Sequence, residues 1–252
     1  MRAWLHQLQR RRDPEAPLIR LVVFDLDGTL IDSIGDIAAA ANESLVEAYG
    51  ESARLTQERV RAFVGSGARR LIERCVEAVE GPADDVGRVF DRFMLAYASR
   101  LTATTRLYPG MEEALDRLGA SAQLAVLTNK PGTMSRAIVR ELGLESRFCS
   151  VIGGDDLASK KPDPEGLRRI AAEAGVRPEQ SALVGDSAID IRTARHAGAL
   201  SVGVLWGYDR EGALREGADL TVESPADLAR MIHEESQRRE KAVRAPQRMS
   251  RR

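Results

Sequence analysis

Two aspartates lie two positions apart directly after a short apolar run near the start of the chain. Residues 21–24 read LVVF, and Asp25 and Asp27 follow this run before a turn at Gly28. A short apolar run bounded by turn residues is typical of a strand that is buried on both faces. In open α/β sheets, ligands bind at the carboxyl ends of the strands. The two carboxylates are therefore predicted to lie where a ligand would bind.

Polar side chains also follow the later strands that the sequence predicts. They are a hydroxyl, an amide, an ammonium and two carboxylates, in the order Thr128, Asn129, Lys161, Asp186 and Asp190. A lone lysine is usually solvated, and a lone acid at a strand end usually belongs to a turn or a helix cap. The carboxyl ends of parallel strands share one edge of a sheet, however, so we expect all these groups to converge with Asp25 and Asp27. Together they indicate a site for a phosphate group.

The second half of the chain alternates between short apolar runs and amphipathic segments. The predicted strands are 123–128, 150–153, 182–185, 202–205 and 220–222, and the predicted helices are 134–142, 166–174, 189–197 and 225–232. Such alternation predicts an α/β fold with a mostly parallel sheet, helices on both of its faces and right-handed crossovers.

Residues 34–106 have helical periodicity throughout and no strand pattern, and they come directly after the first strand. We therefore expect an inserted helical cap domain. The full division is an N-terminal extension at 1–17, a catalytic core at 18–33 and 107–235, the cap at 34–106, and a basic, disordered tail at 236–252. The tail is assigned from its basic composition and its lack of an apolar stripe.

Composition narrows the class of protein. The 252 residues are 43% hydrophobic and 30% charged, with a net charge of −1. This balance gives no electrostatic reason to expect nucleic acid or a membrane surface as a partner. No apolar run approaches the ~20 residues that span a bilayer, and the polar N-terminus lacks the apolar segment of a signal peptide. We expect a cytoplasmic monomer or homodimer that acts on a small molecule.

The motifs resemble those of the haloacid dehalogenase superfamily of phosphotransferases. The resemblance rests on Asp25-x-Asp27-Gly28-Thr29, Thr128-Asn129, Lys161-Pro162 and Gly185-Asp186-Ser187-x-x-Asp190, in that order along the chain. It implies a Rossmann-like, three-layer core and a magnesium-dependent phosphomonoesterase. The helical insertion resembles the small α-helical cap of the phosphoglycolate phosphatase-like branch.

The resemblance also implies a role for each of these residues. Asp25 would be the nucleophile that forms an aspartyl-phosphate, and Asp27 the acid and base that serves the leaving group and then water. The metal ligands would be the side chains of Asp25 and Asp186 and the backbone carbonyl of Asp27. The phosphate oxygens would be held by Thr128, Asn129 and Lys161. Asp190 would orient Lys161 or a water bound to the metal.

The cap stretch most suited to a substrate contact is 64–70, which reads VGSGARR. Its glycines free the backbone, and its N–H groups open a helix whose dipole favours an anion. The candidate contacts are Ser66, Gly67, Arg69 and Arg70, and either arginine could hold a carboxylate through a bidentate fork. The alternative is that both arginines are solvated helix surface. Gly-x-Gly at this place resembles the phosphoglycolate phosphatases, which implies 2-phosphoglycolate as the first choice of substrate.

Two related chemistries are excluded. A dehalogenase needs no acid two residues after its nucleophile, because halide leaves unprotonated, so Asp27 argues for phosphate. A phosphonatase needs a cap lysine, and residues 34–106 contain none. A sugar-phosphate phosphatase, a phosphomutase and a non-catalytic regulatory relative stay open.

Overall fold

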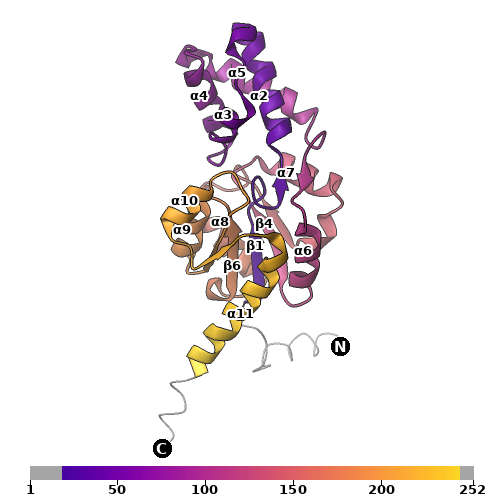
Figure 1. Ribbon diagram of the computed structural model, residues 1–252, viewed down its shortest axis with the longest axis vertical. Helices are drawn as coiled ribbons and strands as arrows, with labels where there is room; N and C mark the ends of the chain where they lie inside the picture. The colour runs from indigo at the N-terminus through magenta and orange to yellow at the C-terminus, as the bar shows by residue number, and fades with distance from the viewer. Residues whose placement is uncertain (1–18, 245–252) are drawn as a thin grey trace, which may run out of the picture.

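The computed structural model describes residues 19–244, and a six-stranded parallel sheet lies at its centre (Figure 1). The strands are β1 (Leu21–Phe24), β4 (Gln123–Leu127), β5 (Ser150–Ile152), β6 (Ser181–Gly185), β7 (Leu200–Val204) and β8 (Leu220–Val222). Their spatial order is β5-β4-β1-β6-β7-β8, and each neighbouring pair is parallel. The predicted α/β class with a mostly parallel sheet is confirmed.

Helices cover both faces of the sheet, and the alternation along β1 shows which helices lie on which face. Val22 and Phe24 point into one apolar cluster, and Leu21 and Val23 into the other. The helices of the first cluster are α6 (Met111–Gly119), α7 (Gly132–Glu141) and α11 (Pro225–Arg244). Those of the second are α8 (Glu165–Glu173) and α9 (Ala188–Ala197). β1 is buried on both sides, which explains its uninterrupted apolar sequence. A further helix, α10 (Arg210–Glu216), packs beside α9.

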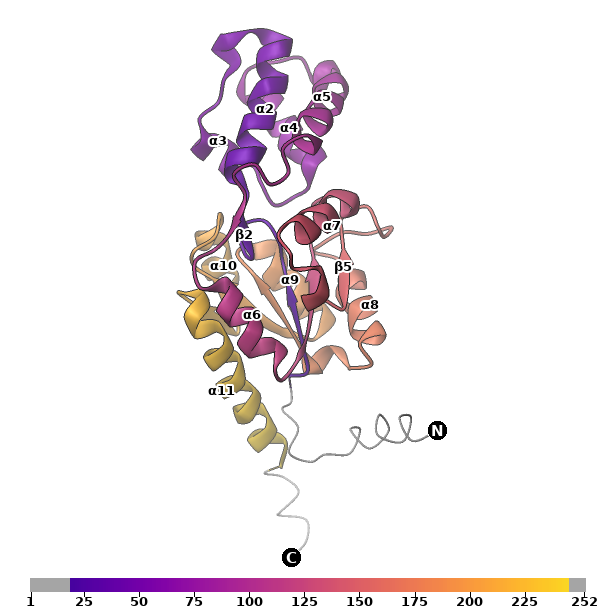
Figure 2. The ribbon, with the colours of Figure 1, turned by 90° about the vertical axis from the view of Figure 1, so that its right-hand side faces the viewer.

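A second group of helices lies beyond one end of the sheet (Figures 1 and 2). We call these four, α2 (Ile34–Tyr49), α3 (Gln57–Arg61), α4 (Ala68–Ala78) and α5 (Val86–Ala98), the cap helices. Buried side chains such as Leu45, Ile72 and Phe93 fill the space between them. The exact limits of the cap as a separate domain stay a prediction.

The chain enters and leaves the cap helices through a two-stranded antiparallel ribbon. Its strands are β2 (Ile31–Asp32) and β3 (Arg106–Leu107). Next to the ribbon, the Asp36 carboxylate accepts hydrogen bonds from the backbone N–H and the hydroxyl of both Thr104 and Thr105, at 2.7–3.0 Å. Burial alone would raise the pKa of Asp36, but these bonds outweigh it and hold the pKa below its usual value. Asp36 thus fastens the start of α2 to the returning chain.

Replacing Asp36 by alanine is expected to lower the free energy of unfolding by about 2–4 kcal/mol at pH 7, because several charge-assisted bonds are lost together. Urea denaturation would measure the loss, with Asp91→Ala on the exposed side of α5 as the control, expected within about 0.5 kcal/mol of wild type. The contribution of a carboxylate with a lowered pKa is complete above the unfolded pKa, about 4. It is lost as the pH falls through the folded value, so the difference should narrow in acid. An equal loss of unfolding free energy in both variants would contradict the conclusion that Asp36 fastens α2 to the returning chain.

The C-terminal helix corrects the predicted tail. α11 continues to Arg244, so the expectation of disorder from residue 236 is wrong for residues 236–244. Leu228, Ile232 and Ser236 follow one another at intervals of four residues and are all buried, which places them on one face of the helix. The serine interrupts the apolar pattern and therefore hides this stripe in the sequence. The extension at 1–17 and residues 245–252 of the tail lie outside the described residues.

Ser236 is expected to contribute measurably to stability. Its hydroxyl accepts the backbone N–H of Ile19 at 3.0 Å, and Ile19 is itself buried. Ser236→Ala would leave that N–H unpaired and should lower the free energy of unfolding by about 1–3 kcal/mol. The neighbouring Gln237 is exposed, so Gln237→Ala is the matched control, and a Ser236→Ala value no larger than this control would refute the contact.

Candidate active site

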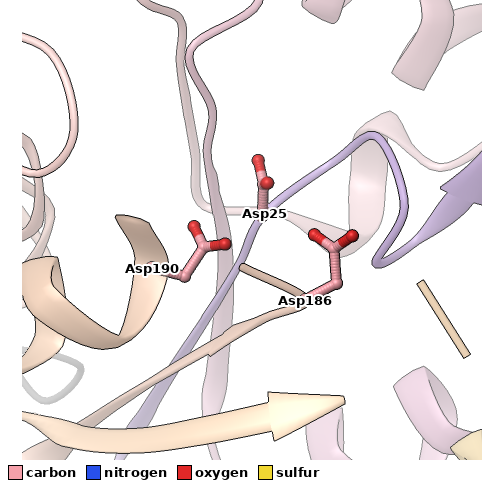
Figure 3. Close-up of side chains that lie close together, drawn as sticks. All are labelled: Asp25, Asp186 and Asp190. Atoms are coloured by element: carbon pink, nitrogen blue, oxygen red, sulfur yellow. The ribbon is translucent and has the colours of Figure 1, made fainter. Parts of the chain in front are cut away.

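Aspartates from three places in the sequence come together at one edge of the sheet (Figure 3). Asp25 follows β1, Asp186 follows β6, and Asp190 lies in the first turn of α9. One carboxylate oxygen from each lies within 4.8 Å of the others, and all three residues are buried. Buried like charges at this distance repel one another and need a cation nearby.

The electrostatics of the cluster fit a bound cation. Burial raises the pKa of Asp25 to about 6; attraction to Lys161 acts in the opposite direction, and repulsion from Asp190 adds to the effect of burial. Burial, with repulsion from Asp190 and Asp25, raises the pKa of Asp186 to about 8. A hard divalent cation prefers carboxylate oxygens and would offset this repulsion. The donor set therefore fits the class of metal ion that the sequence predicts.

Asp190 already has partners for both of its oxygens. Its Oδ1 lies 2.6 Å from Nζ of Lys161, and its Oδ2 accepts the Ser187 hydroxyl at 2.6 Å. Asp186 uses Oδ2 to accept the backbone N–H of Tyr208 at 2.6 Å. The geometry makes Asp190 a partner of Lys161 and leaves Asp25 and Asp186 as the principal candidates to hold a metal.

Lys161 is buried between two acids. Its Nζ lies 2.8 Å from Oδ1 of Asp25, in addition to its contact with Asp190. Burial alone would lower the pKa of this ammonium, but attraction to Asp190 and Asp25 outweighs it and raises the pKa above the usual value. Lys161 is thus a permanent positive charge next to Asp25.

Thr128 and Asn129 follow β4 and are buried beside the same edge. The Thr128 Oγ1 accepts the backbone N–H of Lys130 at 3.2 Å, which leaves the hydroxyl hydrogen free to donate. The Asn129 amide donates to the backbone carbonyls of Gly65 at 3.0 Å and of Lys161 at 3.1 Å. Asn129, at the end of β4, therefore joins the segment between α3 and α4 to the loop that carries Lys161.

The Asp27 carboxylate lies outside the cluster of three aspartates. Both of its oxygens lie 3.0 Å from Nζ of Lys130, and Oδ1 also accepts the Ser33 hydroxyl at 2.5 Å. Lys130 in turn contacts the Tyr97 hydroxyl from α5 at 2.5 Å. Sequence reasoning gave Lys130, Ser33 and Tyr97 no role. For Lys130 the available signal was its position directly after Thr128 and Asn129.

A small cavity of about 50 Å³ lies between the sheet edge and the cap helices. Its polar lining includes Asp25, Asp27, Thr128, Asn129, Lys130 and Tyr97, and its cap side includes Val64, Gly65, Gly67, Leu71 and Phe93. Pockets for drug-sized ligands measure ~300–1,000 Å³, so this cavity suits a small ligand. Gly67 has φ +94°, and a Cβ there would lie 3.2 Å from the Asn129 carbonyl oxygen, so the close approach favours glycine.

The other three cap candidates lie outside the lining of this cavity. Arg70 pairs with Glu73 at 2.9 Å, and the Arg69 guanidinium lies 5.6 Å from the centre of the Phe90 ring. Both arginine side chains are more than half exposed, at 59% for Arg69 and 53% for Arg70. The Ser66 carbonyl accepts a bond from Nζ of Lys160 at 2.8 Å. A role in substrate binding for these three residues stays a prediction.

Comparison with known proteins identifies similar chains. The sequence model described as "Haloacid dehalogenase-like hydrolase" matches residues 22–204. A phosphoglycolate phosphatase of Chromobacterium violaceum is 38% identical over 216 residues, which cover 83% of this chain and 95% of that protein. One from Rhodospirillum rubrum is 39% identical over 206 residues, 79% of this chain and 85% of that protein.

Solved structures show the same similarity. The crystal structure of a predicted phosphoglycolate phosphatase from Haemophilus somnus 129PT superposes with a TM-score of 0.79 at 30% identity. The match covers 85% of this chain and 98% of that one. The fold of this chain therefore occurs in other proteins.

Proposed function

Because the chain belongs to the haloacid dehalogenase-like hydrolase family, we propose that it is a magnesium-dependent phosphatase that hydrolyses 2-phosphoglycolate. The observation that carries the proposal is the Asp25 carboxylate, which lies beside Asp186 and 2.8 Å from Nζ of Lys161, on the lining of a small cavity. The similarity to phosphoglycolate phosphatases over most of the chain supports the choice of substrate. Within residues 19–244, no helix is long and apolar enough to cross a membrane.

The metal site in this proposal consists of oxygen donors. The side chains of Asp25 and Asp186 and the backbone carbonyl of Asp27 would hold Mg²⁺, and the bound cation would offset the charge of the phosphate. Asp190 would hold Lys161 in place through their 2.6 Å contact. A cytoplasmic location and a monomeric or homodimeric state are further parts of the proposal.

Asp25 begins the reaction by attacking phosphorus. Its Oδ1 accepts the Leu26 N–H at 2.7 Å and contacts Lys161, so Oδ2 is the oxygen that forms the new bond. The bond from phosphorus to the alcohol oxygen breaks, and protonated Asp27 donates its proton to that oxygen. Lys161 and the Thr128 hydroxyl hold the phosphoryl oxygens, where charge resides in the transition state.

Hydrolysis of the aspartyl-phosphate reverses the role of Asp27. The ionised Asp27 takes a proton from water as that water attacks phosphorus. The bond from phosphorus to Asp25 breaks, inorganic phosphate leaves, and Asp25 returns as a carboxylate. Asp27 thus donates a proton in the first half-reaction and accepts one in the second. This role fits a carboxylate that lies outside the cluster of three aspartates.

The test is kcat/KM across a panel of small phosphate monoesters with and without Mg²⁺. We expect phosphoglycolate to exceed sugar phosphates and nucleotides by tenfold or more, about 1.4 kcal/mol in transition-state binding, and EDTA to abolish turnover. A sugar phosphate that leads by the same margin would overturn the substrate. Transfer of phosphate to a second hydroxyl of a sugar would identify a mutase. No release of phosphate from any ester would identify a non-catalytic relative.

A further inference from the structure

Lys130 is a buried lysine on the lining of the cavity, and the mechanism above does not use it. It is 7% exposed, and its Nζ lies 3.0 Å from both Asp27 oxygens and 2.5 Å from the Tyr97 hydroxyl. Within residues 19–244, it is the only lysine or arginine that lines this cavity. A buried ammonium is costly unless it is paired, and here its charged partner is Asp27, the acid of the proposed reaction.

The position of Lys130 suits the short distance between the carboxylate and the bridging oxygen of a small phosphorylated acid. In phosphoglycolate a single methylene separates the carboxylate from the bridging oxygen, so the carboxylate oxygens lie within about 3–4 Å of that oxygen. To protonate the bridging oxygen, Asp27 must approach it to about 2.6–3.2 Å. A cation 3.0 Å from both oxygens of Asp27 is therefore adjacent to the place that the carboxylate would occupy.

We propose that Lys130 determines specificity by binding the carboxylate of the leaving group, an inference that rests on the proposed function. An ammonium has three hydrogens to donate, and in this structure they serve the two Asp27 oxygens and Tyr97. When Asp27 turns one oxygen toward the bridging oxygen of the substrate, one N–H of Lys130 becomes available to the substrate carboxylate. Tyr97 keeps the ammonium in place meanwhile.

The rest of the cavity supports this assignment. Its cap side presents apolar side chains, namely Val64, Leu71 and Phe93. A carboxylate against such a surface is unfavourable unless a charge or a hydrogen bond meets it. Arg69 and Arg70, the cations that the sequence suggests, line a different surface depression, which also includes Lys161, and both arginines pair there with Glu73. An uncharged leaving group would offer Lys130 no replacement for the Asp27 oxygen that it gives up.

The test compares 2-phosphoglycolate with its carboxamide analogue, which has nearly the same shape and no charge on the leaving group. The measured quantity is the ratio of kcat/KM for the acid to kcat/KM for the amide. Lys130→Met is expected to reduce this ratio by about 10²-fold or more, because a buried charge pair is lost. Lys130→Arg should retain part of it. Lys160→Met is the control, since Lys160 contacts the Ser66 carbonyl outside the cavity lining, and its ratio should equal that of wild type.

Each other outcome has a definite meaning. If wild type prefers the acid and Lys130→Met lowers kcat/KM equally for both esters, Lys130 only positions Asp27 and the inference is wrong, while the proposed function stands. A wild-type ratio near one overturns the proposed substrate and the role of Lys130 with it. If Arg69→Met or Arg70→Met lowers the ratio more than Lys130→Met does, the arginines of α4 bind the substrate carboxylate and the inference about Lys130 is wrong. Should Lys130→Met fail to fold, Lys130→Gln gives the same comparison with a polar side chain.

Discussion

Replacement of Asp25 by asparagine is expected to reduce kcat for phosphoglycolate by at least about 10⁴-fold, the scale of loss when a covalent nucleophile is removed. The amide has the size of the carboxylate but cannot form the bond to phosphorus. The fold should remain. Burial raises the pKa of Asp25 to about 6, so the ionised form is less favourable in the folded chain than in the unfolded chain. Above pH 6 a neutral side chain should therefore leave Tm unchanged or higher.

Rapid acid quenching of a single turnover would measure this prediction directly. Wild type should retain labelled phosphate on the protein, and Asp25→Asn should retain none. Asp163→Asn, an exposed aspartate two residues beyond Lys161, is the matched control and should behave as wild type. Turnover by Asp25→Asn near the wild-type rate, with mass spectrometry showing that the asparagine is intact, would exclude the aspartyl-phosphate mechanism.

Replacement of Asp27 by asparagine should slow phosphorylation of Asp25 most for esters whose leaving-group oxygen must be protonated. An alkyl alkoxide is a poor leaving group and needs general acid catalysis, which contributes about 10²–10⁴-fold, whereas nitrophenolate leaves without a proton. In single-turnover phosphorylation of Asp25, the variant should therefore lose about that factor with phosphoglycolate and far less with nitrophenyl phosphate. Asparagine keeps an oxygen for Lys130, so the cavity should retain its form.

The dephosphorylation step supplies an internal control for Asp27. Water needs a base whatever the alcohol was, so Asp27→Asn should slow hydrolysis of the aspartyl-phosphate equally after either substrate. Labelled phosphate should then accumulate on the protein with nitrophenyl phosphate. Equal losses for the two esters in the phosphorylation step would remove Asp27 from the acid role.

The convergence of the buried acids and Lys161 could be predicted because parallel topology places all strand ends at one edge. Asp25 and Asp186 end neighbouring strands, β1 and β6, so their proximity follows from the strand order alone. The stretch 64–70 is the part of the cap that the sequence favours for a substrate contact, and Gly65 and Gly67 from it line the cavity. Here local pattern and topology determine the result.

The contacts of single long side chains could not be predicted in the same way. Lys130 meets Asp27 across 103 positions of sequence and Tyr97 across 33, and no local pattern contains either pair. Arg70 shows the opposite case, because its partner Glu73 is three residues away and helical spacing alone makes that pair available. The sequence leaves two partners open for Arg70, a ligand carboxylate or Glu73 on the same helix, and the structure shows the pair with Glu73.

The antiparallel ribbon of β2 and β3 has a consequence for how this enzyme could change its substrate. Ile31 and Leu107 are paired across the ribbon. The chain that forms the cap helices therefore departs from the core and returns to it at adjacent points, like the loop of a hairpin. Lengthening or exchanging such a loop adds little to its closure entropy. The cap helices are therefore a module that recombination can replace without displacing Asp25, Asp186 or Lys161. Lys130 lies on the core side of that boundary, but its contact with Tyr97 of α5 crosses it. A chimera with a foreign cap should therefore keep the proposed preference for an anionic leaving group only where the new cap supplies a hydrogen-bond partner in the place of Tyr97.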